Sequence, residues 1–393
     1  MGIMKINVAV LFGGKSVEHE VSIISAVQAM ANIDTEKYRV VPVYITKDNE
    51  FYYGEDLRDI RLYRNLKGLV ARCRRVVFIR EKGRVRLVKY PGGLFSGGPI
   101  CDIDVALPVV HGTNVEDGAL QGYLKTLDVP FVGCNVLASA VGMDKYVMKI
   151  LLKEAGFPVL DCLRFTVPDP ENVKKVEAKF GYPVIVKPVN LGSSVGISKA
   201  AGPEELEHAL TDAFAFSDKV LVEPAITQLR EINCAVLGDA SEAIASECEE
   251  PFATDQILSY KDKYVDGGKS KSGASKGMAS LKRQIPAELP PELRQRIQEL
   301  AVGTFQTLDC NGVARIDFMI DKADGSVWVN EINTIPGSLA FYLWQPVGIK
   351  YPDLLERLIA LALKRRRKEE EITYSFDTNI LSMGGPFGSK GRK

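Results

Sequence analysis

The stretch VARIDFMIDKADGSVWVNEIN, residues 313–333, decides the fold of this chain. Side chains alternate along a strand, so over 313–320 Arg315 and Asp317 share one face while apolar residues fill the other. A turn signal follows at 323–325, at hairpin spacing. The stretch therefore predicts a β-hairpin with one buried face and one charged face.

The second strand of this hairpin adds oxygen-bearing side chains. We expect one of its faces to present Val327, Val329, Glu331 and Asn333. Glu331 and Asn333 would then lie across from Asp317. Two carboxylates among apolar strands are costly unless a cation neutralises them, and an Asp, Glu and Asn set suits Mg²⁺ held together with phosphates. The alternative is a solvated face of an antiparallel pair, with Arg315 in a surface salt bridge.

A lysine and a glycine loop upstream favour the metal and phosphate interpretation. Lys187 lies near the end of the apolar run VIVKP at 184–188, and GSSVG follows at 192–196. Amides and hydroxyls of such a loop can surround phosphate oxygens, and Lys145 would supply a second charge. The spacing differs from that of a G-x-x-x-x-G-K-[ST] phosphate loop, and Gly13-Gly14 lacks the spacing of a dinucleotide fingerprint.

The first 136 residues alternate strand and helix patterns, which predicts an α/β unit. Strands are expected at 7–12, 39–45 and 105–110, with a helix at 118–127. A charged insert between the second and third of these strands has runs at 76–80 and 85–89 around Lys82-Gly83, which predicts a β-hairpin. We expect this insert to be peripheral.

Two further units are predicted at 137–229 and 230–364. The first is expected to be a small α+β lobe, with a helix at 145–155 and strands at 182–188 and 219–223. The second is expected to contain strands at 233–237, 312–320 and 327–332, and helices at 291–308 and 352–363.

Two segments of the chain are not expected to belong to a packed core. Residues 260–282 become rich in Gly, Ser and Lys, which predicts a mobile lid. The tail at 365–393 is assigned no function, and KRRRK at 364–368 is read as a solvated helix end in preference to a nucleic-acid patch.

Composition limits the classes of function. The chain has 393 residues, with 50 Lys plus Arg and 50 Asp plus Glu, so it lacks the basic excess of proteins that bind nucleic acids or membrane surfaces non-specifically. Its 7 cysteines are scattered and suggest neither a disulfide framework nor a zinc site. No run of about 20 apolar residues and no signal-peptide pattern is present. A cytoplasmic protein acting on small molecules is expected.

The motifs together resemble the D-alanine–D-alanine ligase family of the ATP-grasp superfamily over residues 5–364. They are LFGGKSVEHEVS at 11–22, HGTNVEDG at 111–118, MDK at 143–145, YKDKY at 260–264 and NEINTIPG at 330–337. The resemblance implies an ATP-grasp fold of mixed α/β and α+β character, behind an N-terminal Rossmann-like (pre-ATP-grasp) α/β domain. It also suggests a homodimer formed through the N-terminal unit.

The resemblance further implies the roles of individual residues. Catalytic positions correspond to Glu18, Ser193, Tyr264, Arg315 and Gly337. Substrate contacts correspond to Glu18, His111, Arg315, Ser338, Tyr342 and Leu343. Nucleotide contacts correspond to Lys145, Lys187, Ser193, Ser194, Glu223, Ile226, Glu231 and Lys263, and the magnesium ligands to Asp317, Glu331 and Asn333. Without the resemblance, Glu18 would be read as an ordinary first-turn glutamate and His111 as a structural histidine.

The activity implied is ATP-dependent joining of two D-alanines through an acyl phosphate, with two Mg²⁺ ions (or Mn²⁺), for peptidoglycan precursors. The sequence departs from the family at SLAFYLW, residues 338–344, which replaces a stretch whose serine helps hold the second substrate's carboxylate. Another acceptor, such as D-serine, D-lactate or a different amino acid, is therefore an alternative. A nucleotide-binding regulator without turnover is a second alternative.

Overall fold

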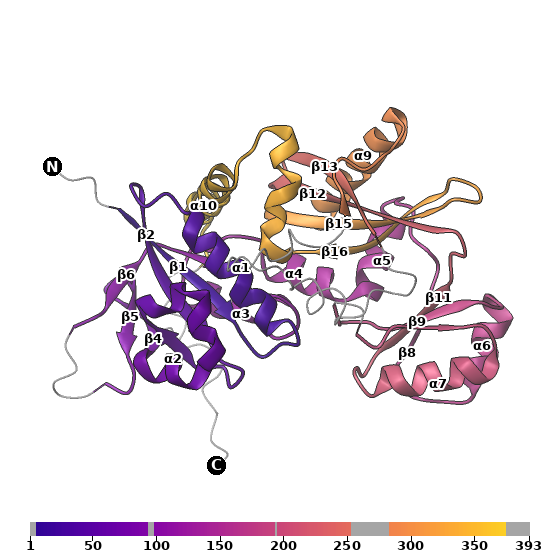
Figure 1. The fold of residues 1–393 in the computed structure, drawn as a ribbon, viewed down its shortest axis with the longest axis horizontal. Helices are drawn as coiled ribbons and strands as arrows, with labels where there is room; N and C mark the ends of the chain where they lie inside the picture. The colour runs from indigo at the N-terminus through magenta and orange to yellow at the C-terminus, as the bar shows by residue number, and fades with distance from the viewer. Residues whose placement is uncertain (1–4, 93–97, 193–194, 253–282, 375–393) are drawn as a thin grey trace, which may run out of the picture.

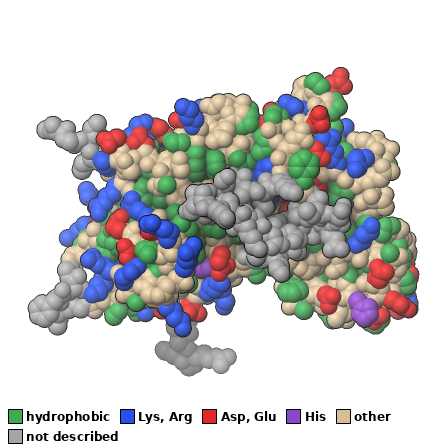
Figure 2. Space-filling model, viewed as in Figure 1, with side chains coloured by type: hydrophobic (Ala, Val, Ile, Leu, Met, Phe, Trp, Pro, Cys, Tyr) green, Lys and Arg blue, Asp and Glu red, His purple; other side chains and the backbone are tan. Residues whose placement is uncertain are grey.

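The structure is a computed structural model that describes residues 5–92, 98–192, 195–252 and 283–374. These ranges form three β-sheets in three units, with the N-terminal unit and the central unit at opposite ends of the molecule (Figure 1). Basic and acidic side chains are interspersed over the visible face of the N-terminal unit (Figure 2). Among the described helices, none combines the length and the apolar character needed to cross a membrane.

The N-terminal unit contains a mixed sheet of order β6-β5-β4-β3-β2-β1-β7. Its strands are β1 (Ile6–Gly13), β2 (Tyr38–Ile45), β3 (Phe51–Tyr53), β4 (Arg74–Glu81), β5 (Arg84–Lys89), β6 (Cys101–Ile103) and β7 (Val105–Pro108). β1 pairs in parallel with β2 and β7, as expected of an α/β unit. The accompanying helices are α1 (His19–Asn32), α2 (Leu66–Arg72) and α3 (Ala119–Thr126), with 3₁₀ turns at Glu55–Arg58 and Ile60–Asn65.

The predicted insert hairpin is confirmed as β4 and β5, but its peripheral placement is wrong. The two strands pair antiparallel and lie inside the sheet between β3 and β6. The reason is their alternation, because Val76, Phe78, Val85 and Leu87 are all buried and belong to the main core of the unit.

The central unit is a small antiparallel sheet of order β10-β9-β11-β8 with two helices against it. Its strands are β8 (Leu163–Phe165), β9 (Val184–Pro188), β10 (Ser198–Ala200) and β11 (Val220–Pro224). The helices α6 (Glu171–Lys179) and α7 (Pro203–Phe214) bury Val176 and Leu206 in the same core as the strands. Helices α4 (Val136–Met143) and α5 (Lys145–Glu154) precede this sheet.

The C-terminal unit contains an antiparallel sheet of order β14-β13-β12-β15-β16. Its strands are β12 (Leu229–Gly238), β13 (Ala243–Pro251), β14 (Arg283–Gln284), β15 (Gly312–Asp321) and β16 (Val327–Asn333). β13 and β14 were not predicted. Helix α9 (Pro291–Thr307) packs on one face of the sheet, and 3₁₀ turns at Gly337–Leu343 (η5) and Gln345–Val347 (η6) lead to α10 (Tyr351–Glu370).

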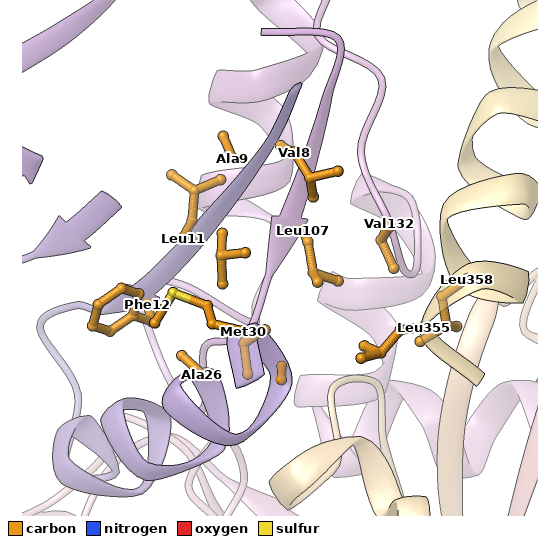
Figure 3. Packing of buried hydrophobic residues seen from close by; sticks show 14 of the residues in the cluster. Val8, Ala9, Leu11, Phe12, Ala26, Met30, Leu107, Val132, Leu355 and Leu358 are labelled. Atoms are coloured by element: carbon orange, nitrogen blue, oxygen red, sulfur yellow. The ribbon is translucent and has the colours of Figure 1, made fainter. Parts of the chain in front are cut away.

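Helix α10 joins the C-terminal unit to the N-terminal one. Leu355 and Leu358 lie beside Val132 and Leu107 in a single core cluster (Figure 3). The helix runs seven residues beyond the predicted end at 363 because its last turns also have partners. The N-terminal unit therefore shares one core with part of the C-terminal unit, whereas the C-terminal sheet and α9 enclose a second core and the central unit has a third.

The basic run at 364–368 is helical, as predicted, but it is more than a solvated end. Arg365 donates hydrogen bonds to the carbonyl oxygens of Phe131 (2.5 Å) and Gly133 (2.7 Å). Arg366 forms an ion pair with Asp128. These contacts satisfy backbone carbonyls and a carboxylate of the N-terminal unit, which explains why the helix continues there.

Candidate active site

The β15–β16 hairpin has the predicted pairing but not the predicted faces. Asp317 is opposite Glu331, and Arg315 is opposite Asn333. A β-bulge follows, since Phe318 pairs with Val329 and leaves Asn330 as the extra residue. Val327 and Val329 therefore face the core with Ile332, while Glu331 and Asn333 lie on the other face. The prediction that these valines share a face with Glu331 and Asn333 is wrong, because one extra residue inverts the alternation.

Asp317 is the centre of a polar cluster on the charged face. Arg315 donates to both of its oxygens, each at 2.6 Å, and Asn333 donates to Oδ2 at 3.1 Å. Both charged side chains are about 15% exposed. Burial opposes the charge on Arg315, but Asp317, Tyr342 and Glu249 together raise the pKa of its guanidinium well above the usual value.

The donor set of this cluster fits a hard divalent cation. Burial raises the pKa of Asp317, and the nearby carboxylates of Glu331 and Glu249 raise it further, against the opposing effect of Arg315. A cation bound there would favour the ionised form. Asp317, Glu331 and Asn333 offer oxygen ligands of the kind that Mg²⁺ takes. In the described part of the chain, no three His, Cys, Asp or Glu side chains form a ready metal cluster, so phosphate oxygens would have to complete the coordination.

Lys145 reaches this hairpin from the first position of α5. The side chain of Asp144 caps that helix by accepting from the amides of Tyr146 (3.1 Å) and Val147 (3.0 Å). The Lys145 ammonium then lies 3.1 Å from Glu331 and donates to the Leu191 carbonyl at 2.8 Å, just before the glycine loop. The MDK motif thus fixes a lysine between the loop and the hairpin.

Lys187 on β9 belongs to a buried triad of charges. Its ammonium donates to Glu223 Oε1 at 2.5 Å, and Lys149 lies 2.8 Å from Glu223 Oε2. All three side chains are at most 5% exposed. Burial alone would raise the pKa of Glu223, but the two lysines lower it to about 2.

The triad contains one more positive than negative charge. Burial lowers the pKa of Lys149, and repulsion from Lys187 adds to this effect, although Glu223 opposes it. The pKa values of Glu223 and Lys149 are therefore both lowered, because the single carboxylate of Glu223 is stabilised by two cations, whereas Lys149 must share that carboxylate with Lys187. Lys187 also donates to Asn330 Oδ1 at 3.2 Å, across to the C-terminal sheet. The bulge at Asn330 therefore has a role at the site.

Sequence reasoning missed Lys149 and Asn330. Lys149 is four residues after Lys145, so the two lysines share one face of α5 and this spacing was a usable signal. The sequence gives no comparable signal for Asn330, because the bulge that directs its side chain toward Lys187 arises from the pairing of β16 with β15.

Glu18 lies where the N-terminal unit meets the glycine loop. A Cβ atom at Gly192 would be 3.0 Å from Glu18 Oε2, and one at Gly112 would be 3.1 Å from the same oxygen. Both glycines are therefore needed for the carboxylate to approach the backbone so closely. Burial lowers the pKa of His111 and the charge of Glu18 opposes that shift, which places the two side chains near each other.

His111 is buried, and its protonation is fixed by its neighbours. The Ile335 carbonyl lies 2.8 Å from Nδ1 and can only accept, so Nδ1 carries the hydrogen. Burial lowers the pKa of the ring, which keeps it neutral, and Nε2 then accepts from the Ser25 hydroxyl at 3.2 Å. The Ser25 oxygen in turn accepts from the Ser338 amide at 2.9 Å.

Glu116 fastens the same region together and was not assigned a role from sequence. Its carboxylate accepts from the amides of Gly112 (2.9 Å) and Ile335 (2.8 Å) and from the Thr334 hydroxyl (3.2 Å). Complete burial raises its pKa to about 7, although these donors oppose the shift. Glu116 thereby ties the HGTNVEDG segment to the residues that lead into Gly337.

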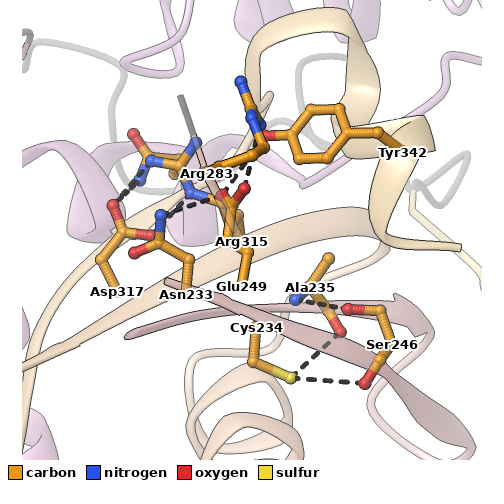
Figure 4. A network of polar contacts seen from close by, with 10 residues as sticks. Asn233, Cys234, Ala235, Ser246, Glu249, Arg283, Arg315, Asp317 and Tyr342 are labelled. Atoms are coloured by element: carbon orange, nitrogen blue, oxygen red, sulfur yellow. Dashed lines mark hydrogen bonds and ion pairs between the residues drawn. The ribbon is translucent and has the colours of Figure 1, made fainter. Parts of the chain in front are cut away.

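A second arginine–carboxylate cluster lies next to Arg315 (Figure 4). Glu249 on β13 is buried and pairs with Arg283 at 2.9 Å, while Asn233 donates to it at 3.0 Å. The Tyr342 hydroxyl donates to the same carboxylate at 3.4 Å, and the Arg283 guanidinium lies 4.1 Å from the centre of the Tyr342 ring. Neither Arg283 nor Glu249 was predicted.

The remaining predicted residues fall in three places. Glu231 is on β12, and Ile226 is half-buried just after β11. Leu343 is fully buried beside Tyr342 at the end of η5, which begins at Gly337. Ser193, Ser194, Lys263, Tyr264 and the predicted lid at 260–282 lie outside the described residues.

A lysine on a helix and a lysine on one sheet, both facing a carboxylate hairpin on another sheet behind an α/β unit, define an ATP-grasp ligase. Two family models match, "D-ala D-ala ligase N-terminus" over residues 7–134 and "D-ala D-ala ligase C-terminus" over 151–360. The chain belongs to the D-alanine–D-alanine ligase family, whose members are ATP-dependent ligases.

Relatives and solved structures agree with this assignment. The D-alanine–D-alanine ligase of Thermosipho melanesiensis is 40% identical over 96% of this chain and 99% of its own length, and that of Acetivibrio thermocellus is 41% identical over 92% and 96%. The Coxiella burnetii D-alanine–D-alanine ligase superposes with a TM-score of 0.78 at 30% identity, covering 94% of this chain and 97% of its own. The VanG D-Ala:D-Ser ligase of Enterococcus faecalis gives 0.78 at 32%, covering 91% and 100%.

Proposed function

We propose that this chain joins two D-alanines to D-alanyl-D-alanine at the expense of ATP, for peptidoglycan precursor synthesis. The observation that carries the proposal is the pairing of Lys145 on α5 with Glu331 and of Lys187 on β9 with Asn330, which brings both lysines to the β15–β16 hairpin. These contacts place two ammonium groups beside an oxygen-ligand hairpin, which is the arrangement that a nucleotide triphosphate and its metal require.

The nucleotide would bind between the central and C-terminal sheets. Lys145 and Lys187 would neutralise the phosphates, with Ser193, Ser194 and Lys263 beside them. Glu223, Ile226 and Glu231 would contact the adenine and ribose. The excess positive charge of the Lys149–Glu223–Lys187 triad favours an anionic ligand at this place.

The metal site would be formed by Asp317, Glu331 and Asn333. Mg²⁺ ions, two by family resemblance and replaceable by Mn²⁺, would neutralise phosphate charge that develops during transfer. Arg315 and Lys145 form ion pairs with the carboxylates of the hairpin.

The first step would activate the donor. An oxygen of the first D-alanine carboxylate attacks the γ-phosphorus of ATP, ADP leaves, and an acyl phosphate forms. Glu18 would orient the donor's ammonium group from the edge of the glycine loop. Its position against Gly192 and Gly112 fits this role.

The second step would form the peptide bond. The acceptor amine attacks the acyl carbon after losing a proton, and phosphate leaves from a tetrahedral intermediate. Arg315 and the Gly337 amide would stabilise the oxyanion of that intermediate. His111 is neutral and hydrogen-bonded through both nitrogens, so it would position the acceptor and not transfer a proton. Ser193 and Tyr264 would complete the catalytic set.

Substitutions in the hairpin test this proposal. Glu331→Gln and Asp317→Asn are expected to lower D-alanine-dependent ADP release by at least about 10³-fold, since a misplaced metal forfeits several kcal/mol of charge stabilisation. Asp324→Asn changes an exposed aspartate in the turn of the same hairpin and should retain full activity. Thermal shifts with ATP alone and with ATP plus Mg²⁺ should show a Mg²⁺-dependent increment that Glu331→Gln removes.

The acceptor is tested by the same reaction. Product mass from mixtures of D-alanine with D-serine, D-lactate and L-amino acids would identify it. A mixed product in preference to D-alanyl-D-alanine would replace the proposal with a ligase of another acceptor. ATP binding without any amino-acid-stimulated ADP release would support the regulator. The homodimer is inferred from the family resemblance and the cytoplasmic location from the scattered cysteines and the missing signal-peptide pattern, and light scattering of the purified chain tests the first.

A further inference from the structure

We propose that Arg283, together with the Tyr342 hydroxyl, binds the α-carboxylate of the acceptor amino acid. This inference rests on the proposed ligase function and concerns the acceptor half of the site. Tyr342 lies in η5, the turn that begins at Gly337 and ends at Leu343.

The two side chains already bind one carboxylate in the structure. Arg283 Nη1 lies 2.9 Å from Glu249 Oε2, and the Tyr342 hydroxyl donates to Oε1 of the same group at 3.4 Å. A guanidinium presents five donors along more than one edge and can bind two carboxylates at once. Glu249, held by Asn233 from the other side, fixes the arginine in place.

The location of the pair points to substrate. Burial and the Glu249 carboxylate raise the pKa of the Tyr342 hydroxyl, and the charges of Arg315 and Arg283 oppose that shift, so the phenol lies close to both guanidinium groups. Figure 4 shows Arg283 paired with Glu249 beside Arg315, which pairs with Asp317. A carboxylate bound at Arg283 would therefore place its own amine near the oxyanion site at Arg315.

The backbone before Tyr342 is arranged to aim it there. Ser338, Leu339 and Ala340 have φ of 51–53°, in the left-handed region that costs about 1–2 kcal/mol per non-glycine residue. The run is held by hydrogen bonds from Ser338 to Ser25 and Gln28. Strain of this kind, sustained by surrounding contacts, clusters at ligand sites.

A purely structural ion pair is the competing explanation. Replacing a buried pair of this kind by apolar residues is often neutral, so burial alone gives little reason to keep it. The Arg283–Glu249 pair lies on the charged face of the sheet, and the Arg283 guanidinium stacks on the ring of Tyr342. A structural role requires neither feature.

The test is a competition between two acceptors in one reaction. The chain is given ATP, Mg²⁺, D-alanine and D-alanine amide, and the ratio of dipeptide to dipeptide amide is measured by mass. This ratio reports relative kcat/KM for the two acceptors and does not depend on the donor step or on the fraction of folded enzyme. The unaltered chain should strongly favour the acid.

Arg283→Met should reduce that preference by about ten- to hundredfold, the effect of losing one charge-assisted hydrogen bond. Arg283→Lys should be intermediate. Arg230→Met removes a neighbouring arginine that pairs with Glu250 outside the cluster and should leave the ratio unchanged. If Arg283→Met fails to fold, Arg283→Met with Glu249→Gln removes both charges and should show the same reduction.

A ratio unchanged within about twofold in these variants would overturn the assignment of Arg283 and leave the ligase function intact. Absence of any D-alanine-stimulated ADP release by the unaltered chain would overturn the function and this inference together. If D-serine is the acceptor, D-serine and its amide replace the pair, and the same reduction is expected.

Discussion

Lys149 offers the sharpest test of how the nucleotide site is built. Its ammonium lies 2.8 Å from Glu223, and both side chains are at most 3% exposed. Lys149→Met removes one of the two cations from a buried carboxylate. Breaking a buried pair costs about 3–5 kcal/mol, and we expect the lower end because Lys187 remains on the other oxygen.

The free energy of unfolding is measured by urea denaturation, with Lys174→Met as the matched control. Lys174 pairs with Glu171 at 2.6 Å, but these side chains are 72% and 58% exposed, so its loss should cost less than about 1 kcal/mol. In Lys149→Met the remaining Lys187–Glu223 pair has no net charge. ATP should therefore bind about tenfold more weakly, which corresponds to a loss of about 1.4 kcal/mol of binding free energy. Equal stability losses in the two variants would refute the reasoning.

Two further predictions concern the contacts between units. Because burial raises the pKa of Glu116 to about 7, its folded form holds a proton between pH 4.5 and 7 that the unfolded chain releases. Its contribution to stability should therefore fall by about 3 kcal/mol as pH rises through that window. Glu116→Gln should remove this pH dependence. An unchanged slope of the free energy of unfolding between pH 5 and 8, measured by urea titration of this variant, would contradict the prediction. Gly192→Ala places a methyl 3.0 Å from Glu18 and should raise the KM for D-alanine about tenfold with little change in stability. Gly202→Ala is the matched control, because its backbone is extended and an added methyl there meets nothing within 4 Å.

Local pattern was sufficient for most strands and helices. The alternation at 313–320 and the turn at 323–325 predicted the hairpin, and the apolar runs predicted β1, β2 and β9. The expected approach of Glu331 to Asp317 across the hairpin is confirmed, but the alternation predicted for 327–333 is wrong because of the bulge. These features depend on residues close together in the chain, whose periodicity is visible in the sequence.

The sequence by itself determined the hairpin, the lysines and the glycine loop of this protein. The tertiary structure decided what those groups contact. The bulge at Asn330 arises only when β16 pairs with β15, and it sends that side chain to Lys187. Glu116 meets Ile335 over a separation of 219 residues. Arg283 likewise meets Glu249 only because β14 pairs with β13. Contacts between distant segments depend on packing and register, and no local periodicity encodes them.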